Sequence, residues 1–154
     1  MHLSFGKYLG AIAMVVTVLA LAGCPSPTSN NPTSPTFTVS GTVSLNTHIN
    51  ATGNATVTVT QGSNSYSTTV AIPAPAATQT VTYSVSDVPA GTYSVTVVFV
   101  SAAYAFLSGT YTLNSGTPVS TGAIYPSGTT FTITIPNIAV GANAELDLSL
   151  SGPA

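Results

Sequence analysis

The residue best suited to chemistry in this chain is Cys24, whose thiol is the only one in the sequence. A lone cysteine cannot form an internal disulfide, and sulfur is the most nucleophilic atom that ordinary side chains offer. Ala22 and Gly23 precede it, and their small side chains leave the backbone open to an approaching peptidase. Leu21 comes before them. This spacing predicts covalent modification of the Cys24 sulfur, coupled to cleavage on its amino side.

The segment ahead of Cys24 has the layout of a secretory signal. Residues 1–7 carry the positive charge, and residues 8–22 form an almost entirely apolar run. A run of this length is typical of a signal peptide, because a membrane-spanning helix needs about 20 apolar residues. We therefore expect a helical signal that is removed from the mature protein.

The sequence Leu21-Ala22-Gly23-Cys24 resembles the lipobox of bacterial lipoproteins. The resemblance implies a signal peptide over residues 1–23, a lipid on Cys24, and lasting attachment to a membrane of the cell envelope. Pro25, not Asp, follows the cysteine, which in enteric-type lipoproteins implies the outer membrane where the cell has one. Ordinary cleavage after Leu21-Ala22, which would free a soluble protein, and an uncleaved anchor are the alternatives.

Few other side chains support catalysis or metal binding. A hydrolytic triad would have to use His48, which lies in a polar loop, and no G-x-S-x-G turn is present. Glu145 and Asp147 share one face of a predicted strand, but Ca²⁺ needs about six to eight oxygen ligands. We interpret this pair as solvated charges at a sheet edge. The sequence thus predicts no catalytic residue, no metal site and no cofactor.

Charge is scarce along the whole chain. Charged residues make up 3% of the sequence, whereas about a quarter is usual. Lys7 is the only basic residue, so no cluster is available to bind phosphates and we expect no nucleic-acid partner. Low charge with many apolar residues favours a folded domain over disorder. Low charge with high β propensity also permits self-association through sheet edges.

Tyrosines are the remaining candidates for ligand contact. The sequence has seven Tyr and no Trp. Tyr104, Tyr111 and Tyr125 lie in the irregular stretch 101–128, where their rings could form a platform that stacks on sugars. The lack of Trp weighs against sugar binding, and packing in the core or its rim is the alternative role of these rings.

The elements that must position these residues begin with a spacer. Residues 24–36 comprise the cysteine and a tether made only of Pro, Ser, Thr and Asn, which predicts a disordered, extended linker. Residues 37–154 form the third segment, in which apolar and hydroxyl-bearing residues alternate. Alternation with a period of two predicts strands.

The predicted strands of the domain recur at short intervals with Gly, Pro or Asn between them. They cover residues 37–45, 55–60, 66–72, 81–85, 93–100, 104–113, 129–135 and 144–150. The strand 93–100 is apolar on both faces near its end, which favours a central position. We predict an all-β domain: a single antiparallel Greek-key β-sandwich of about seven or eight strands, of the prealbumin or immunoglobulin-like kind.

Three short motifs carry a family resemblance. They are V-x-G-x-V at 39–43, NATVTV at 54–59 and P-x-G-x-Y at 89–93. In this order they resemble the carboxypeptidase regulatory-like, transthyretin-like sandwich domains of secreted bacterial proteins. The Thr-Asp-x-x-Gly turn of those domains is missing, and the segment 61–80 that replaces it is longer. The resemblance implies a fold more than a function.

The P-x-G-x-Y motif also has a direct physical interpretation. Pro89 fixes φ at the entry to a turn, Gly91 permits a positive φ, and Tyr93 anchors the next strand. Anchor, spacer and sandwich together predict a non-enzymatic structural or protein-interaction module in the cell envelope, with envelope proteins or glycans as partners. A carbohydrate-binding module that uses the loop tyrosines is the alternative.

Overall fold

The computed structural model describes residues 34–46, 49–74 and 78–153. In these residues the segments with alternating apolar and hydroxyl-bearing side chains form strands. The predicted signal helix, the lipobox with Cys24, most of the tether and His48 lie outside these residues. The strands are β1 (Thr36–Asn46), β2 (Thr52–Gln61), β3 (Asn64–Ala71), β4 (Thr78–Pro89), β5 (Gly91–Val100), β6 (Leu107–Leu113), β7 (Val119–Ile124), β8 (Thr130–Val140) and β9 (Ala144–Ser151).

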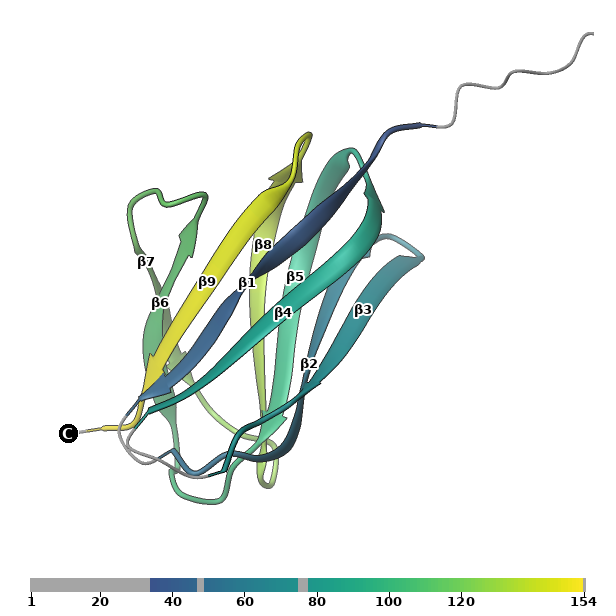
Figure 1. The fold of residues 1–154 in the computed structure, drawn as a ribbon. Coiled ribbons are helices and arrows are strands. Elements are labelled where there is room, and N and C mark those ends of the chain that lie inside the picture. The colour runs from purple at the N-terminus through teal and green to yellow at the C-terminus, as the bar shows by residue number, and fades with distance from the viewer. Residues whose placement is uncertain (1–33, 47–48, 75–77, 154) are drawn as a thin grey trace, which may run out of the picture. The chain divides into compact units, whose positions relative to one another are not determined.

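Two sheets pack face to face, which confirms the predicted all-β sandwich (Figure 1). One sheet has the order β4-β1-β9-β6-β7 and the other the order β3-β2-β5-β8. Neighbouring strands are antiparallel except β1 and β9, which run parallel. The strand β5 lies between β2 and β8, as its two apolar faces predicted. Within the described residues no helix has the length and hydropathy needed to cross a membrane.

The core lies between the inner faces of the two sheets. The rings of Phe99 on β5 and Phe131 on β8 stack with centroids 5.7 Å apart. Leu146, Leu148 and Leu150 of β9 are buried and face them from the other sheet's inner side. The outer faces carry mainly Thr and Ser, so a chain with little charge still presents hydroxyl groups to water.

One strand was missed from the sequence. β7 contributes only Val119 and Ile124 as large apolar side chains, and Val119 is 47% exposed. Because β7 is the last strand of its sheet, it buries little and has no strong alternation. The described residues of the domain therefore form nine strands where about seven or eight were predicted.

The prediction that Glu145 and Asp147 lie at a sheet edge was wrong. Glu145 and Asp147 do not lie at a sheet edge, because β9 is flanked by β1 and β6. Asp147 is half-buried and accepts hydrogen bonds from the backbone N–H and the hydroxyl of Thr42, both at 2.8 Å. Its carboxylate therefore holds two central strands together.

The turn before β5 is also built differently. Positive φ occurs at Asp87 (60°), whereas Gly91 has no positive φ. A Cβ on Gly91 would lie 2.8 Å from Nε2 of Gln61, the end of a flexible and exposed side chain that can move aside, so space alone does not require glycine here. Tyr93 does anchor the strand as predicted, since its hydroxyl donates to the Pro89 carbonyl at 2.9 Å. A tyrosine bonded to backbone a few residues upstream also stabilises a strand corner in immunoglobulin-like sandwiches.

Candidate binding groove

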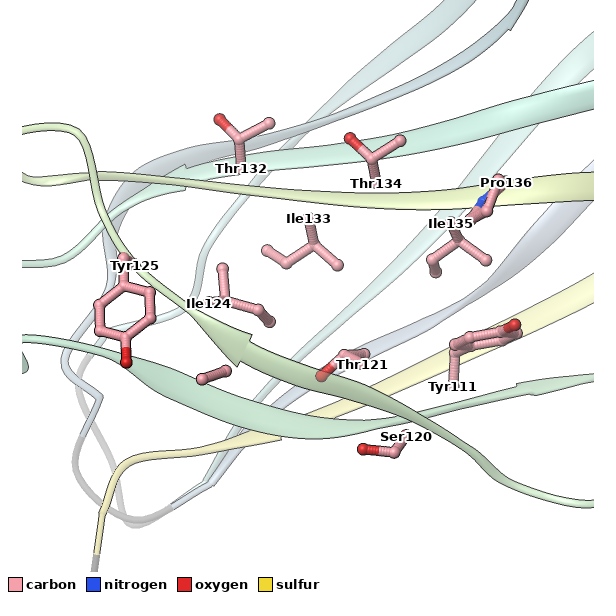
Figure 2. Close-up of a pocket in the computed structure, with 11 residues that line it drawn as sticks. Tyr111, Ser120, Thr121, Ile124, Tyr125, Thr132, Ile133, Thr134, Ile135 and Pro136 are labelled. Carbon is pink, nitrogen blue, oxygen red and sulfur yellow. The ribbon is translucent and has the colours of Figure 1, made fainter.

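A groove opens where the edges of the two sheets face each other. β7 is the last strand of the five-stranded sheet, and β8 is the last strand of the four-stranded sheet. Between them lies a cavity of about 530 Å³ (Figure 2). This volume falls in the range of about 300–1,000 Å³ that is common for ligand pockets. We call this feature the β7–β8 groove.

The groove has an apolar floor. Ile133 and Ile135 of β8 are 3% and 1% exposed, and Ile124 of β7 is 9% exposed. Figure 2 shows the side chains of Ile124 and Ile133 in the space between the two strands. Ala123 and Pro136 complete the apolar lining. An apolar ligand group that enters here would pack against these side chains, which already expose little surface to water.

Hydroxyl-bearing residues line the remaining walls. The Thr121 hydroxyl donates to the carbonyls of Gly109 and Gly122, each at 3.1 Å, and the Ser120 hydroxyl accepts from the Gly122 N–H at 3.1 Å. These bonds stabilise the irregular register between β6 and β7, which shifts after Gly109. The Ser120 and Thr121 hydroxyls thus already serve the fold.

The three predicted tyrosines do not form one platform. Tyr111 and Tyr125 both line the β7–β8 groove. Tyr125 is 72% exposed, and its ring centroid lies 5.8 Å from that of Phe106, a residue that sequence reasoning did not select. Tyr104 is not among the lining residues. It lies over Gly152, where a Cβ would be 2.5 Å from the Tyr104 ring.

The groove is electrically neutral. Its lining residues include no Asp, Glu, Lys, Arg or His. In the described part of the chain, no three His, Cys, Asp or Glu residues gather in a way that could hold a metal ion. A charged ligand group would therefore lose its hydration in the groove without gaining an ionic partner, which is costly. The groove is suited to uncharged ligands.

The backbone N–H and C=O groups of β8 point alternately toward β5 and toward the outer edge of the sheet. The Ser101 N–H donates to the Thr129 carbonyl at 2.9 Å, and this bond continues the register of β5 with β8. Alternate residues of an antiparallel strand direct their N–H and C=O to the same side. Phe131, Ile133 and Ile135 thus direct theirs to β5, while the threonines between them direct theirs outward.

Only a short part of that edge is available. At one end the N–H and C=O of Thr130 bond the C=O and N–H of Ser127, at 3.1 and 2.9 Å. At the other end Pro136 has no N–H. Between these limits lie Thr132 and Thr134, and the sheet order places no described strand beside them. Four backbone groups in register, two donors and two acceptors, are thus presented along the groove.

Comparison with known proteins finds no relative: no protein-family model, no curated protein and no solved structure matches the chain. The likeness to carboxypeptidase regulatory-like domains therefore stays a prediction from short motifs.

Proposed function

We propose that this chain is a lipid-anchored protein of the cell envelope whose β-sandwich is a non-enzymatic interaction module, with the β7–β8 groove as its partner site. The observation that supports this most is the groove itself, a neutral cavity of about 530 Å³ with an apolar floor and exposed Tyr125 at its rim. Exposed aromatic residues beside apolar pockets are common at protein interfaces.

The anchoring part of the proposal rests on the sequence. Leu21-Ala22-Gly23-Cys24 supplies the lipid attachment site, and residues 25–36 supply a spacer before the sandwich. Twelve residues at about 3.1 Å each would extend roughly 37 Å. A module on such a spacer can reach partners beyond the membrane surface.

The non-enzymatic part is supported by how the polar side chains are used. The Asp147 carboxylate is bonded to Thr42 between central strands, and the Tyr83 hydroxyl is bonded inside the core. Neither is presented to a substrate. The groove offers hydroxyls and tyrosines but no acid–base pair among its lining residues. Such a site is fitted to bind and not to transform.

The anchor is tested by metabolic labelling with a fatty acid. Cys24→Ser should abolish the label and move the protein out of the membrane fraction, whereas Ser26→Ala in the tether should leave both unchanged. Protease treatment of intact cells then reports which side of the envelope the sandwich faces. A fully labelled Cys24→Ser protein would contradict lipidation at this residue.

The partner site is tested by site-specific photocrosslinking in cells. A photoreactive phenylalanine analogue in place of Tyr125 should give discrete crosslinked products. The same analogue in place of Thr82, which is exposed on the outer face of β4, is the control. Equal products from both positions would mean that the groove is not the partner site.

A neutral carbohydrate is the second candidate ligand. It is favoured by the pair of rings formed by Tyr125 and Phe106 at one end of the groove, with Tyr111 at the other end (Figure 2). Sugars stack on exposed rings of this kind. A glycan array should then give hits that Tyr125→Ala removes and Tyr104→Ala, outside the groove, retains.

A further inference from the structure

We infer that the β7–β8 groove binds an extended, uncharged polypeptide segment of another protein, which adds to the outer edge of β8 as a further strand. This rests on the proposed function, in which the groove is the partner site, and specifies the chemistry of the partner. The segment pairs with Thr132 and Thr134 through its backbone and places alternate side chains in the groove.

The hydrogen-bonding pattern of the edge calls for a strand. Thr132 and Thr134 each present one N–H and one C=O outward, at the spacing of a regular ladder. An extended backbone satisfies all four groups at once, and main-chain pairing of this kind gives affinity with little dependence on sequence. Because Ser127 and Pro136 bound the edge, the paired part of the segment spans about five residues.

The pleat decides where the partner's side chains go. Neighbouring strands in a sheet share their inner and outer faces. On β8 the inner face carries Ile133 and Ile135, which line the groove, and the outer face carries Thr132 and Thr134. Every second side chain of an added strand therefore enters the groove beside the isoleucines. The partner segment should alternate apolar and small polar residues.

The same geometry disfavours a second copy of this chain. In a second copy, β8 is already paired with its own β5, and its Ile133 and Ile135 are buried in its own core. Edge-to-edge pairing would leave the β7–β8 groove unfilled. Only a segment that brings no sheet of its own can use both the edge and the cavity.

A glycan fits the groove less well. The Ser120 and Thr121 hydroxyls are engaged with the backbone of β6 and β7. Thr132 and Thr134 direct their side chains to the outer face. Besides the hydroxyls of Tyr111 and Tyr125, few side-chain polar groups of the lining are left to bond sugar hydroxyls, whereas the outward backbone groups of β8 suit a peptide.

The experiment measures peptide binding by the intact mature protein extracted in mild detergent. The probes are four fluorescent peptides, Lys-(Thr-X)₃-Thr-Lys, in which X is Val, Ile, Leu or Phe. Each has a twin that is N-methylated at alternate residues, so that it keeps its side chains but loses donors to β8. At least one probe should bind, and its twin should bind at least tenfold more weakly.

Matched variants of the protein isolate the backbone of the edge. Thr134→Pro removes an outward N–H without breaking a bond to β5, and it should weaken probe binding at least tenfold. Thr134→Val removes only the hydroxyl and should bind as the parent does. Thermal unfolding checks that both are folded. If Thr134→Pro fails to fold, the comparison of each probe with its methylated twin on the parent protein tests the edge without a variant.

Other results would overturn the inference. Equal binding of a probe and its methylated twin would show that strand addition is not the mode of binding. Failure of all four probes, with glycan binding that Tyr125→Ala removes, would assign the groove to sugars. Failure of the probes with concentration-dependent dimerisation would assign the edge to a second copy. In each case crosslinking from position 125 decides separately whether the groove is a partner site at all.

Discussion

The hydroxyl of Tyr83 donates a hydrogen bond of 2.7 Å to the carbonyl of Leu146, although the strands of the two residues, β4 and β9, are separated by β1. The ring crosses β1 beside Gly41, which pairs with Tyr83 and has no side chain to obstruct it. In a continuous parallel ladder of this register, the Leu146 carbonyl would instead accept from the Thr42 N–H. Here the Thr42 N–H donates to Oδ1 of Asp147. The Tyr83 hydroxyl takes its place as the donor to the Leu146 carbonyl.

Removing the Tyr83 hydroxyl should destabilise the sandwich. Tyr83→Phe leaves the buried Leu146 carbonyl without a donor, and an unpaired buried group of this kind costs about 1–3 kcal/mol. We expect the free energy of unfolding, measured with denaturant, to fall by that amount. Tyr125→Phe, at a 72% exposed position, is the control and should change little. Equal stability of the two variants would mean that the bond contributes nothing.

Tyr83 should also make the fold sensitive to alkali. Burial of the ring raises the pKa of Tyr83 well above its usual value, and the nearby Asp147 charge raises it further. The folded protein therefore keeps this proton at a pH where the unfolded chain, with a pKa of about 10, loses it. This contribution to stability is complete below pH 10 and declines as the pH rises above it. Unfolding at intervals from pH 8 to 11 should show the decline for the parent and a flatter profile for Tyr83→Phe.

The absence of a side chain at position 41 should be essential. Gly41 has φ of 156°, and a Cβ there would collide with the backbone carbonyl of Leu146. Gly41→Ala must push β1 and β9 apart, and we expect a loss of about 3 kcal/mol in unfolding free energy. Gly141→Ala is the matched control, because nothing lies within 4 Å of a Cβ there. A Gly41→Ala protein as stable as this control would refute the close approach.

Gly41 was noted in the sequence only as part of the V-x-G-x-V motif, and the reason for a glycine there was not predicted. The alternation of apolar residues predicts most strands because each buries one face, and Gly41 simply takes one of the inward positions of its strand. The position of Leu146 opposite this glycine depends on β9 lying parallel to β1, and periodicity carries no information on strand order. The same limit explains why Asp147 was assigned to a sheet edge.

The groove was predictable only in part. Tyr111 and Tyr125 were selected because aromatic residues in an irregular stretch are common ligand contacts. Ile133 and Ile135 alternate in the sequence like any buried strand residues, so nothing marked them as the floor of an open groove. What distinguishes them is that β8 is the last strand of its sheet. A two-residue alternation is the same in edge and central strands.

The buried amide of Gln79 should respond sharply to a change of one atom. Gln79 is 1% exposed. Its Nε2 donates to the Ala51 carbonyl at 3.0 Å and to the Pro73 carbonyl at 2.8 Å. Its Oε1 accepts from the Ala51 N–H at 3.0 Å. Gln79→Glu replaces the donor with an oxygen that faces two carbonyls. At pH 7 an ionised carboxylate there would be both desolvated and repelled, so we expect a loss of about 3 kcal/mol or more in unfolding free energy.

The pH dependence of Gln79→Glu identifies the cause of that loss. A buried carboxyl beside carbonyl oxygens has its pKa raised in the folded state, so the folded variant retains a proton that the unfolded chain loses near pH 4.3. Below that pH the protonated carboxyl donates to one carbonyl and part of the stability returns; above it the stability falls as the pH rises. Gln61→Glu is the control, because Gln61 is exposed and its Nε2 donates only to the Thr92 carbonyl, at 3.1 Å. If the two Glu variants have the same unfolding free energy at pH 7 and the same trend toward pH 4, the amide of Gln79 does not hold the segment at Ala51 in place.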